Sequence, residues 1–153
     1  DLAVEHLSLP KAWVGRNGAA SKPNPIVEEL ISAARRGVRV RVLLNNDGVF
    51  GQEVSAVSEE DKNISTVAYL RSKASKEKIP LEAAIFNNDA LEVAYVHNKG
   101  MVADGSKVFL GSINGTENAV MNNREVAVSL SSKDAARYFG EVFQLDWEMS
   151  NKK

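Results

Sequence analysis

The chain contains 153 residues, of which 44% are hydrophobic and 25% are charged, and its net charge at pH 7 is −1. This composition is typical of one globular domain with a real core, and it excludes a broad basic field for nonspecific nucleic-acid binding, although a locally basic cleft stays compatible with it. The sequence has no cysteine, which excludes a disulfide framework and a thiolate metal site, and no apolar run near the roughly 18 residues of a membrane-spanning helix.

The first part of the sequence predicts a strand, a loop and a helix. Residues 2–9 read as a buried strand, and residues 10–23 form a loop long enough to carry function. Trp13 in this loop fits the mouth of a substrate site, but packing over the edge of a sheet is the more ordinary interpretation. Asn24 and Pro25 fit the cap and the first turn of a helix.

The middle of the sequence predicts a strand, a helix and a further strand. Residues 38–44 predict a strand with Arg39 and Arg41 on one face. These arginines could reach an acidic substrate, although a solvated strand face is the more ordinary interpretation. Residues 53–78 predict mostly helix, with an acidic first part that is less well defined, and residues 81–86 predict another strand.

The following segment brings together two residues suited to phosphate chemistry. After a turn at residues 87–89, residues 92–97 predict a strand that leads into Lys99. Because residues two apart in a strand face the same way, His97 and Lys99 would project side by side. A lysine ammonium can hold a phosphate anion, and an imidazole can attack phosphorus or move a proton.

A predicted hairpin returns the chain to this histidine. The Asp-Gly pair at residues 104–105 lies between apolar runs, which is a strong hairpin signal, and residues 107–111 predict the returning strand. The return brings Ser112 and Asn114 toward His97. Their hydroxyl and amide groups suit the oxygens of a phosphoryl group.

The last part of the sequence adds a carboxylate and a long helix. Glu125 opens a predicted strand at residues 126–130, where it could accept the second N–H of the His97 imidazole and fix its tautomer. A short helix is predicted after residue 115, and a long amphipathic helix at residues 133–149. Strands alternate with helices, so the predicted class is α/β, a mixed β-sheet flanked by helices on both faces.

The spacing of these residues forms a specific pattern, H-x-K-x4-D-x6-G-S-x-N, followed by an Asn-Arg-Glu sequence. This pattern resembles the HKD motif of the phospholipase D superfamily, and the resemblance covers most of the chain, from Leu2 to Trp147. The fold that it implies is the α-β-α sandwich of that family. The residues that carry the motif are His97, Lys99, Asp104, Gly111, Ser112 and Asn114.

The resemblance implies a metal-independent phosphodiesterase or phosphatidyltransferase that needs no cofactor. The implied catalytic residues are His97, Lys99 and Glu125, with His97 as the nucleophile that forms a covalent phosphohistidine, or as its acid–base partner. Lys99, Ser112 and Asn114 would bind the substrate phosphate, and Glu125 would orient His97. The implied role of Asp104 and Gly111 is structural.

The family's chemistry uses two HKD motifs, and this sequence carries one. The whole chain, residues 1–153, is therefore expected to be a single phospholipase D-like domain. Either it pairs with a second copy of itself, or it is the C-terminal half of a tandem protein, which the start at Asp1 favours. An isolated half could be inactive without its partner.

Several functions stay open at the level of sequence. The alternatives to the enzyme above are a nuclease of the same superfamily and a binding or structural half with an incomplete site. A metal-site hydrolase is disfavoured, because His6 and His97 are the only histidines and His6 is read as a satisfied strand residue. The expected substrate is a phosphodiester, with a phospholipid favoured over nucleic acid. The localisation is open, and a soluble domain outside the cytoplasm or held at a membrane by further segments is compatible with the sequence.

Overall fold

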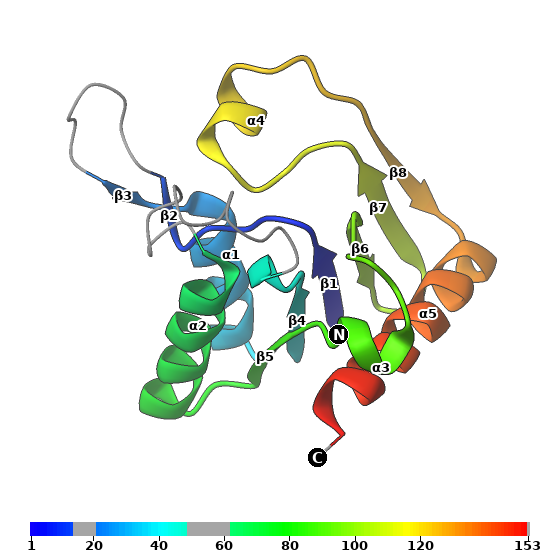
Figure 1. Cartoon of the computed structure of the whole chain (residues 1–153), viewed down its shortest axis with the longest axis horizontal. Helices are drawn as coiled ribbons and strands as arrows, with labels where there is room; N and C mark the ends of the chain where they lie inside the picture. Colours follow the sequence, from blue (N-terminus) through cyan, green and yellow to red (C-terminus); the bar gives the residue numbers. More distant parts are fainter. Residues whose placement is uncertain (14–20, 49–61, 153) are drawn as a thin grey trace.

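The computed structural model describes residues 1–13, 21–48 and 62–152 of the chain. Within these residues, the centre of the fold is a sheet of six strands in the order β5-β4-β1-β6-β7-β8 (Figure 1). The first three of these are mutually parallel, and β6, β7 and β8 each run antiparallel to their neighbour, so the sheet is mixed, as predicted. The strands are β1 Leu2–His6, β4 Val40–Leu44, β5 Leu81–Ile85, β6 Lys99–Ala103, β7 Lys107–Gly111 and β8 Ala127–Ser131.

One face of the sheet is covered by α1 (Pro25–Arg35) and α2 (Asn63–Glu77), which enclose the larger hydrophobic core. Helix α1 begins where the sequence predicts, because the Asn24 side chain accepts a hydrogen bond from the Ile26 N–H at 3.0 Å and a proline follows it. The core residues with no exposed surface include Val4, Val27, Ile31, Val42 and Leu70.

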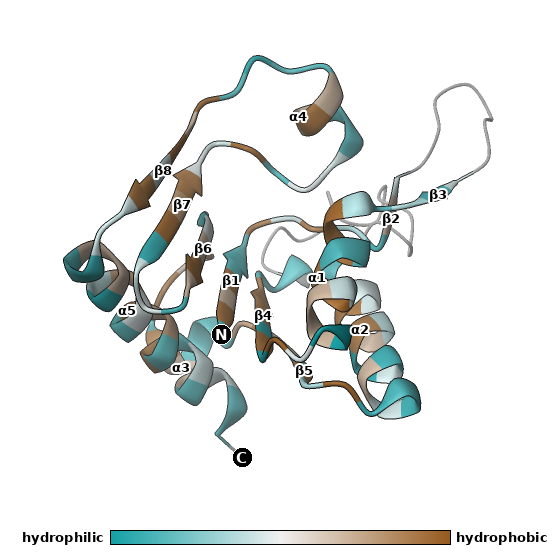
Figure 2. Ribbon diagram, turned by 180° about the vertical axis from the view of Figure 1, so that it is seen from behind, coloured by the Kyte–Doolittle hydropathy of each residue, from teal (hydrophilic) through white to brown (hydrophobic). Residues whose placement is uncertain are grey.

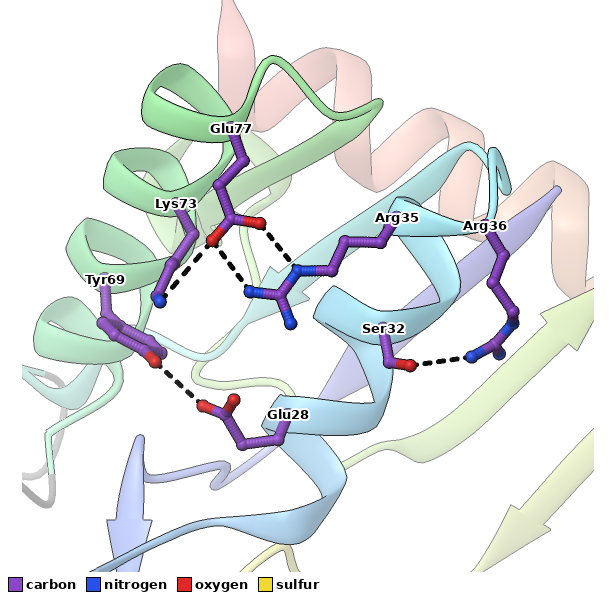
Figure 3. A network of polar contacts seen from close by, with 7 residues as sticks. All are labelled: Glu28, Ser32, Arg35, Arg36, Tyr69, Lys73 and Glu77. Carbon is purple, nitrogen blue, oxygen red and sulfur yellow. Dashed lines mark hydrogen bonds and ion pairs between the residues drawn. The ribbon is translucent and has the colours of Figure 1, made fainter.

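Polar contacts at the outer side of this face join the two helices (Figure 3). Arg35 donates two hydrogen bonds to the Glu77 carboxylate, at 2.6 and 2.8 Å, and the Tyr69 hydroxyl donates to Glu28 at 2.8 Å. The arginine and the glutamate are partly exposed, and such surface pairs contribute little to stability. The hydrophobic core therefore holds α1 and α2 in place.

The other face is covered by α5 (Lys133–Asn151), with the short helix α3 (Asn88–Leu91) beside it. Helix α5 begins at its predicted position, and its cap Ser132 accepts a hydrogen bond from the Ala135 N–H at 3.2 Å. A smaller core, to which Leu43, Phe86 and Phe143 belong, lies beneath the helix. The fold is thus an α/β sandwich with helices on both faces of a mixed sheet.

Arg39 and Arg41 have different surroundings in the structure. The Arg41 guanidinium lies 5.0 Å from the centre of the Phe143 ring and donates to the Gln144 side chain at 2.6 Å. Arg39 pairs with Asp1 at 2.9 Å instead. Arg41 is thus partly buried and packs beneath α5, whereas Arg39 is exposed, as the interpretation of a solvated strand face expects.

The predicted strand at residues 92–97 is wrong. This segment is irregular, and β6 starts only at Lys99. Side chains hold its backbone in place of a neighbouring strand, since Asn88 donates to the Val93 and Ala94 carbonyls at 3.4 and 3.1 Å and Asn45 accepts from the Val96 N–H at 2.9 Å. The predicted turn at residues 87–89 is likewise replaced, by the start of α3.

Other local predictions are confirmed. Asp104 and Gly105 both have positive φ, at 51° and 57°, and form the turn between β6 and β7. The short helix after the motif is α4 (Glu117–Met121).

The predicted loop at residues 10–23 differs from a plain loop, because it includes a small two-stranded ribbon, β2 (Ala12–Trp13) and β3 (Lys22–Pro23). Residues 53–61 of the predicted second helix lie outside the described residues. Among the described residues, no helix is long and apolar enough to span a membrane.

Candidate functional site

The motif residues gather at one end of the sheet because the strands there alternate in direction. The end of β1 lies beside the start of β6, with His6 opposite Lys99 in the register. The end of β7 lies beside the start of β8, with Gly111 opposite Ala127. Just outside these strand ends, Ser112 contacts Glu125, and His97 precedes Lys99 at the same end of the sheet. Asp104 lies at the far end of the β6–β7 hairpin.

Lys99 is the buried cation of this site. Only 6% of the residue is exposed, and its Nζ donates to the His97 carbonyl oxygen at 2.8 Å. Burial lowers the pKa of its ammonium, and the negative charge of Glu125 acts in the opposite direction. The two motif residues are thus brought together through the main chain of the histidine, although not by the regular strand that the sequence predicts.

Glu125 is held as a carboxylate. It accepts a short hydrogen bond from the Ser112 hydroxyl and a second one, at 2.9 Å, from the Asn123 amide. These hydrogen bonds, in that order, and the charge of Lys99 keep the pKa of Glu125 below its usual value. Ser112 is itself fixed by backbone bonds, since its N–H donates to the Val126 carbonyl at 2.9 Å. A negative charge therefore lies between the serine and the lysine at neutral pH.

His97 is exposed, and its ring meets the Tyr95 ring edge-on with centroids 5.9 Å apart. In the described part of the chain, no hydrogen bond joins the His97 ring to Glu125, so the orienting role of this carboxylate remains a prediction. The Asn114 side-chain oxygen is buried and has no hydrogen-bond partner among the described residues. The oxygen of the Asn114 amide therefore makes no hydrogen bond to a described protein group.

His6 packs behind the site as a neutral histidine. It is 5% exposed, and its Nδ1 accepts a hydrogen bond from the Ser8 N–H at 3.3 Å. Burial, followed by the positive charge of Lys99, lowers the pKa of His6 to about 4. Among the described residues, no group of three histidine, aspartate or glutamate side chains could hold a metal ion. The interpretation of His6 as a satisfied strand residue is confirmed.

The loop that follows β7 is locked in place by close backbone contacts that the sequence did not reveal. A Cβ on Gly115 would lie 2.3 Å from Leu9 Cδ1 and 3.1 Å from the Ser8 carbonyl oxygen. The Gly115 carbonyl accepts hydrogen bonds from Trp13 Nε1 at 2.9 Å and from Asn24 Nδ2 at 2.8 Å. Trp13 is buried, so its packing interpretation is confirmed, and it supports the loop that carries Ser112 and Asn114.

A pocket of about 210 Å³ opens beside this site, between the sheet and α5, and is called the α5 pocket here. His97 and Lys99 line its polar end together with Glu5, which accepts a hydrogen bond from the Asn98 amide at 2.8 Å. Burial, and then the negative charge of Asp146, raise the pKa of Glu5 to about 7. Glu5 was not predicted as a site residue, because no local pattern marks a strand glutamate that a helix distant in sequence covers.

The chain matches a family of known proteins over most of its length. Residues 18–147 match the family described as "Cardiolipin synthase, PLD-like domain", which is more than half of the chain. The chain belongs to this phospholipase D-like family. The predicted membership of the phospholipase D superfamily is thereby confirmed.

Relatives and solved structures agree with this membership. Mitochondrial cardiolipin hydrolase from Canis lupus familiaris is 27% identical over 117 residues, which is 76% of this chain but only 38% of that protein. The chain thus spans about two fifths of the length of the curated relatives that it matches. Two solved structures share the fold, the phospholipase D family member Nuc from Salmonella typhimurium, with a TM-score of 0.70 at 19% identity, and NucT from Helicobacter pylori, with 0.66 at 18%. They cover 99% and 97% of this chain, which covers 80% and 79% of theirs.

Proposed function

We propose that this domain cleaves or transfers phosphodiesters through a covalent phosphohistidine at His97. The observation that carries the proposal is the linked set of contacts at one end of the sheet, in which Lys99 bonds to the main chain of His97 and Glu125 bonds to Ser112. A cation, a nucleophile and hydroxyl and amide groups gathered at an open strand end suit a tetrahedral phosphoryl group. Membership in the phospholipase D-like family supports the same chemistry.

The proposed reaction has two steps, and the second histidine gives up a proton in the first and regains one in the second. The free ring nitrogen of His97 attacks phosphorus, an N–P bond forms, and the P–O bond to the leaving alcohol breaks while a second histidine gives that alcohol its proton. Water or another alcohol then attacks phosphorus, gives its proton to the second histidine and releases His97. Lys99, Ser112 and Asn114 bind the phosphoryl oxygens, and Glu125 stabilises the charged imidazole. No metal takes part in either step.

The second histidine comes from another HKD half, either a second copy of this chain or a further part of a longer protein. An unpaired sheet edge supports this requirement, because β8 ends the sheet of the described residues. Val126, just before β8, and Val128 and Leu130 within it are 69%, 50% and 43% exposed. Figure 2 shows this hydrophobic edge on β8, and the neighbouring α5 exposes 62% of Tyr138. An apolar edge next to the site is a surface that a second half can cover.

Phospholipid is the favoured substrate. The curated relatives are named for the hydrolysis of cardiolipin, which is a phospholipid. The net charge of −1 offers little attraction for a polyanion such as nucleic acid. A nuclease of the same superfamily is the alternative, and so is a binding half whose site is complete only with a partner.

The test is hydrolysis of a fluorogenic phosphodiester and of phosphatidylcholine in excess chelator, with the His97→Ala variant beside the wild type. The variant is expected to lose at least a thousandfold in kcat, since removing a nucleophile removes the covalent route. Lys99→Met should also lose activity, whereas the matched Lys107→Met, at the hairpin end of β7, should keep it. Mass spectrometry of the acid-quenched wild type would detect the phosphohistidine. Undiminished, chelator-sensitive turnover in His97→Ala would contradict the proposal, and cleavage of DNA alone would favour the nuclease.

A further inference from the structure

The α5 pocket lies on the sheet face that α5 covers. Glu5 of β1 pairs with Gly100 of β6, and Gly100 pairs with Leu110 of β7, so these three positions share one face. Lys99 pairs with His6 instead, and both alternate to the opposite face. The interior of the pocket therefore lies across the sheet from the Lys99 side chain, and a molecule that binds there need not contain a phosphate.

A buried carboxyl group lines this pocket. Glu5 is 7% exposed, and one of its oxygens accepts the hydrogen bond of 2.8 Å from the Asn98 amide. Its other oxygen accepts no hydrogen bond from the residues that the structure describes. Because a carboxylate loses its hydration on burial, an oxygen without a donor leaves part of that cost uncompensated. The lining thus contains an acceptor that a ligand can use.

A second carboxyl group adds negative charge close to the first. Burial, and then the charge of Asp146, raise the pKa of Glu5 to about 7, and burial also raises the pKa of Asp146. Neither group forms an ion pair within the described part of the chain. The Arg41 guanidinium, which stacks on Phe143, donates to Gln144 at 2.6 Å. This end of the pocket therefore has an excess of acid that a cation would balance.

The rest of the lining is suited to the apolar part of a ligand. Its apolar side chains come from the sheet and from α5, and they are Val102, Leu110, Phe139, Val142 and Phe143. Carbon walls give no oxygen ligands to a metal ion, whereas aromatic rings stabilise organic cations. The volume of about 210 Å³ lies below the range of about 300–1,000 Å³ that is typical of sites for larger ligands. A small organic cation therefore matches the pocket in both charge and size.

We propose that the α5 pocket binds a small primary alkylammonium ion, with its ammonium group on Glu5 and its alkyl group against the apolar walls. The ammonium donates to the free Glu5 oxygen, and the charge of Asp146 adds to the attraction. The alkyl group leaves water for the side chains of α5 and the sheet. This site is distinct from the proposed phosphate site, and its occupation requires neither the reaction at His97 nor a second HKD half.

The test measures the binding of n-butylammonium to the whole domain at constant ionic strength, by NMR titration of aromatic and methyl signals, with 1-butanol as the neutral ligand of equal size. At pH 8 the ammonium is expected to bind roughly tenfold more tightly than the alcohol, because a hydrogen bond to a charged group is worth about that much. Ammonium chloride, which lacks the alkyl group, should bind about tenfold more weakly than n-butylammonium, or weaker still. The affinity for n-butylammonium should increase about tenfold from pH 6 to pH 8, since Glu5 loses its proton through pH 7.

Two pairs of variants locate the ligand. Glu5→Gln should weaken n-butylammonium binding roughly tenfold at pH 8 and remove its pH dependence, while 1-butanol binds as before. Glu141→Gln, at an exposed position of α5 outside the lining, is the matched control and should change neither ligand's affinity. Val142→Trp should weaken the binding of both ligands because it fills the pocket, whereas Leu145→Trp, at a 55% exposed position outside the lining, should not.

Three results would overturn the inference. They are equal affinities of the wild type for n-butylammonium and 1-butanol, equal losses in Glu5→Gln and Glu141→Gln, and a pH dependence that persists in Glu5→Gln. Should Glu5→Gln not fold, the preference of the wild type for the ammonium and its loss in Val142→Trp decide the question. Because no turnover is measured, these results are independent of whether the domain cleaves phosphodiesters.

Discussion

The two faces of the sheet are built for different purposes. On the α1/α2 face the core is large and closed, and residues such as Val27, Ile31 and Leu70 expose no surface. On the α5 face the core is smaller, it contains an arginine stacked on aromatic rings, and the outer side of α5 leaves Tyr138 and Leu145 exposed. The difference indicates that the first face supplies stability, whereas the second holds the α5 pocket and the exposed surface that we propose a second HKD half covers.

Two neighbouring residues of β1, Glu5 and His6, lie on the two different faces of the sheet. Alternation turns His6 toward the α1/α2 side and Glu5 toward the α5 pocket. Both are buried, yet burial shifts their pKa values in opposite directions, since it disfavours the charged form of each. The strand thus joins the closed half of the domain to the open half.

The strongest way to test the contrast is a matched pair of truncations. Ile31→Ala in the closed core should lower the free energy of unfolding by about 2–5 kcal/mol, because it removes buried methyl groups and leaves a cavity. Leu145→Ala on the open face of α5 should change it by less than about 0.5 kcal/mol. Urea titrations measure both values. Equal losses would show that the open face is as tightly packed as the closed one.

The next effect is on the pH dependence of stability. Glu5 has a native pKa of about 7 against a reference of 4.5, so its stability contribution is present below pH 4.5 and is lost as the pH rises through 7. His6 has a native pKa of about 4 against 6.5, so its contribution is present above pH 6.5 and is lost as the pH falls through 4. Between pH 4.5 and 6.5, the contribution of Glu5 makes stability fall as the pH rises, and the contribution of His6 makes it rise, so the two effects oppose each other.

Single substitutions should separate the two slopes. Glu5→Gln should leave stability that increases with pH between 4 and 6.5, and His6→Gln should leave stability that decreases with pH between 4.5 and 7. Each difference from the wild type should reach up to about 3 kcal/mol across its window. Urea unfolding at half-unit pH steps measures it. Parallel curves for the wild type and both variants would show that neither group titrates with a shifted pKa.

A smaller change in stability, with a larger change in activity, is expected at Gly111. A Cβ there would lie 2.6 Å from the Val126 carbonyl oxygen and 2.7 Å from Ala127 Cβ, so β7 and β8 would have to separate. Gly111→Ala should cost about 1–3 kcal/mol and should pull Ser112 away from Glu125. The matched Gly140→Ala, where a new Cβ meets no atom within 4 Å, should leave both stability and activity near wild type. Loss of stability without loss of activity would separate this glycine from the site.

Much of the fold could be predicted from local signals. The Asn24 cap, the Asp104 turn and the Ser132 cap each act within a few residues, so the sequence places their elements correctly. The return of β7 to the end of the sheet at which Lys99 lies could also be predicted, because the hairpin fixes which strand ends meet.

The errors arise where distant side chains decide the local structure. The segment before His97 follows a strand-like sequence, but the amides of Asn45 and Asn88 hold its backbone in an irregular path. Glu5 and the α5 pocket depend on how a helix some 140 residues away in sequence packs against β1, which no local pattern records. The support of Gly115 by Trp13 likewise spans 102 residues and is visible only in three dimensions.

Loss of the hydrogen bond from Trp13 to Gly115 is expected to have the smallest effect. This bond joins the N-terminal part of the chain to the loop after β7. Trp13→Phe keeps most of the buried ring but removes the hydrogen bond of 2.9 Å to the Gly115 carbonyl, which still accepts from Asn24 at 2.8 Å. Because the carbonyl keeps one partner, the loss of stability should be only about 0.5–1.5 kcal/mol. Activity should fall more than stability does, mainly through KM, since the loop that carries Ser112 and Asn114 loses one of its two anchors. An unchanged KM in a variant with the expected loss of stability would show that Asn24 alone positions the loop.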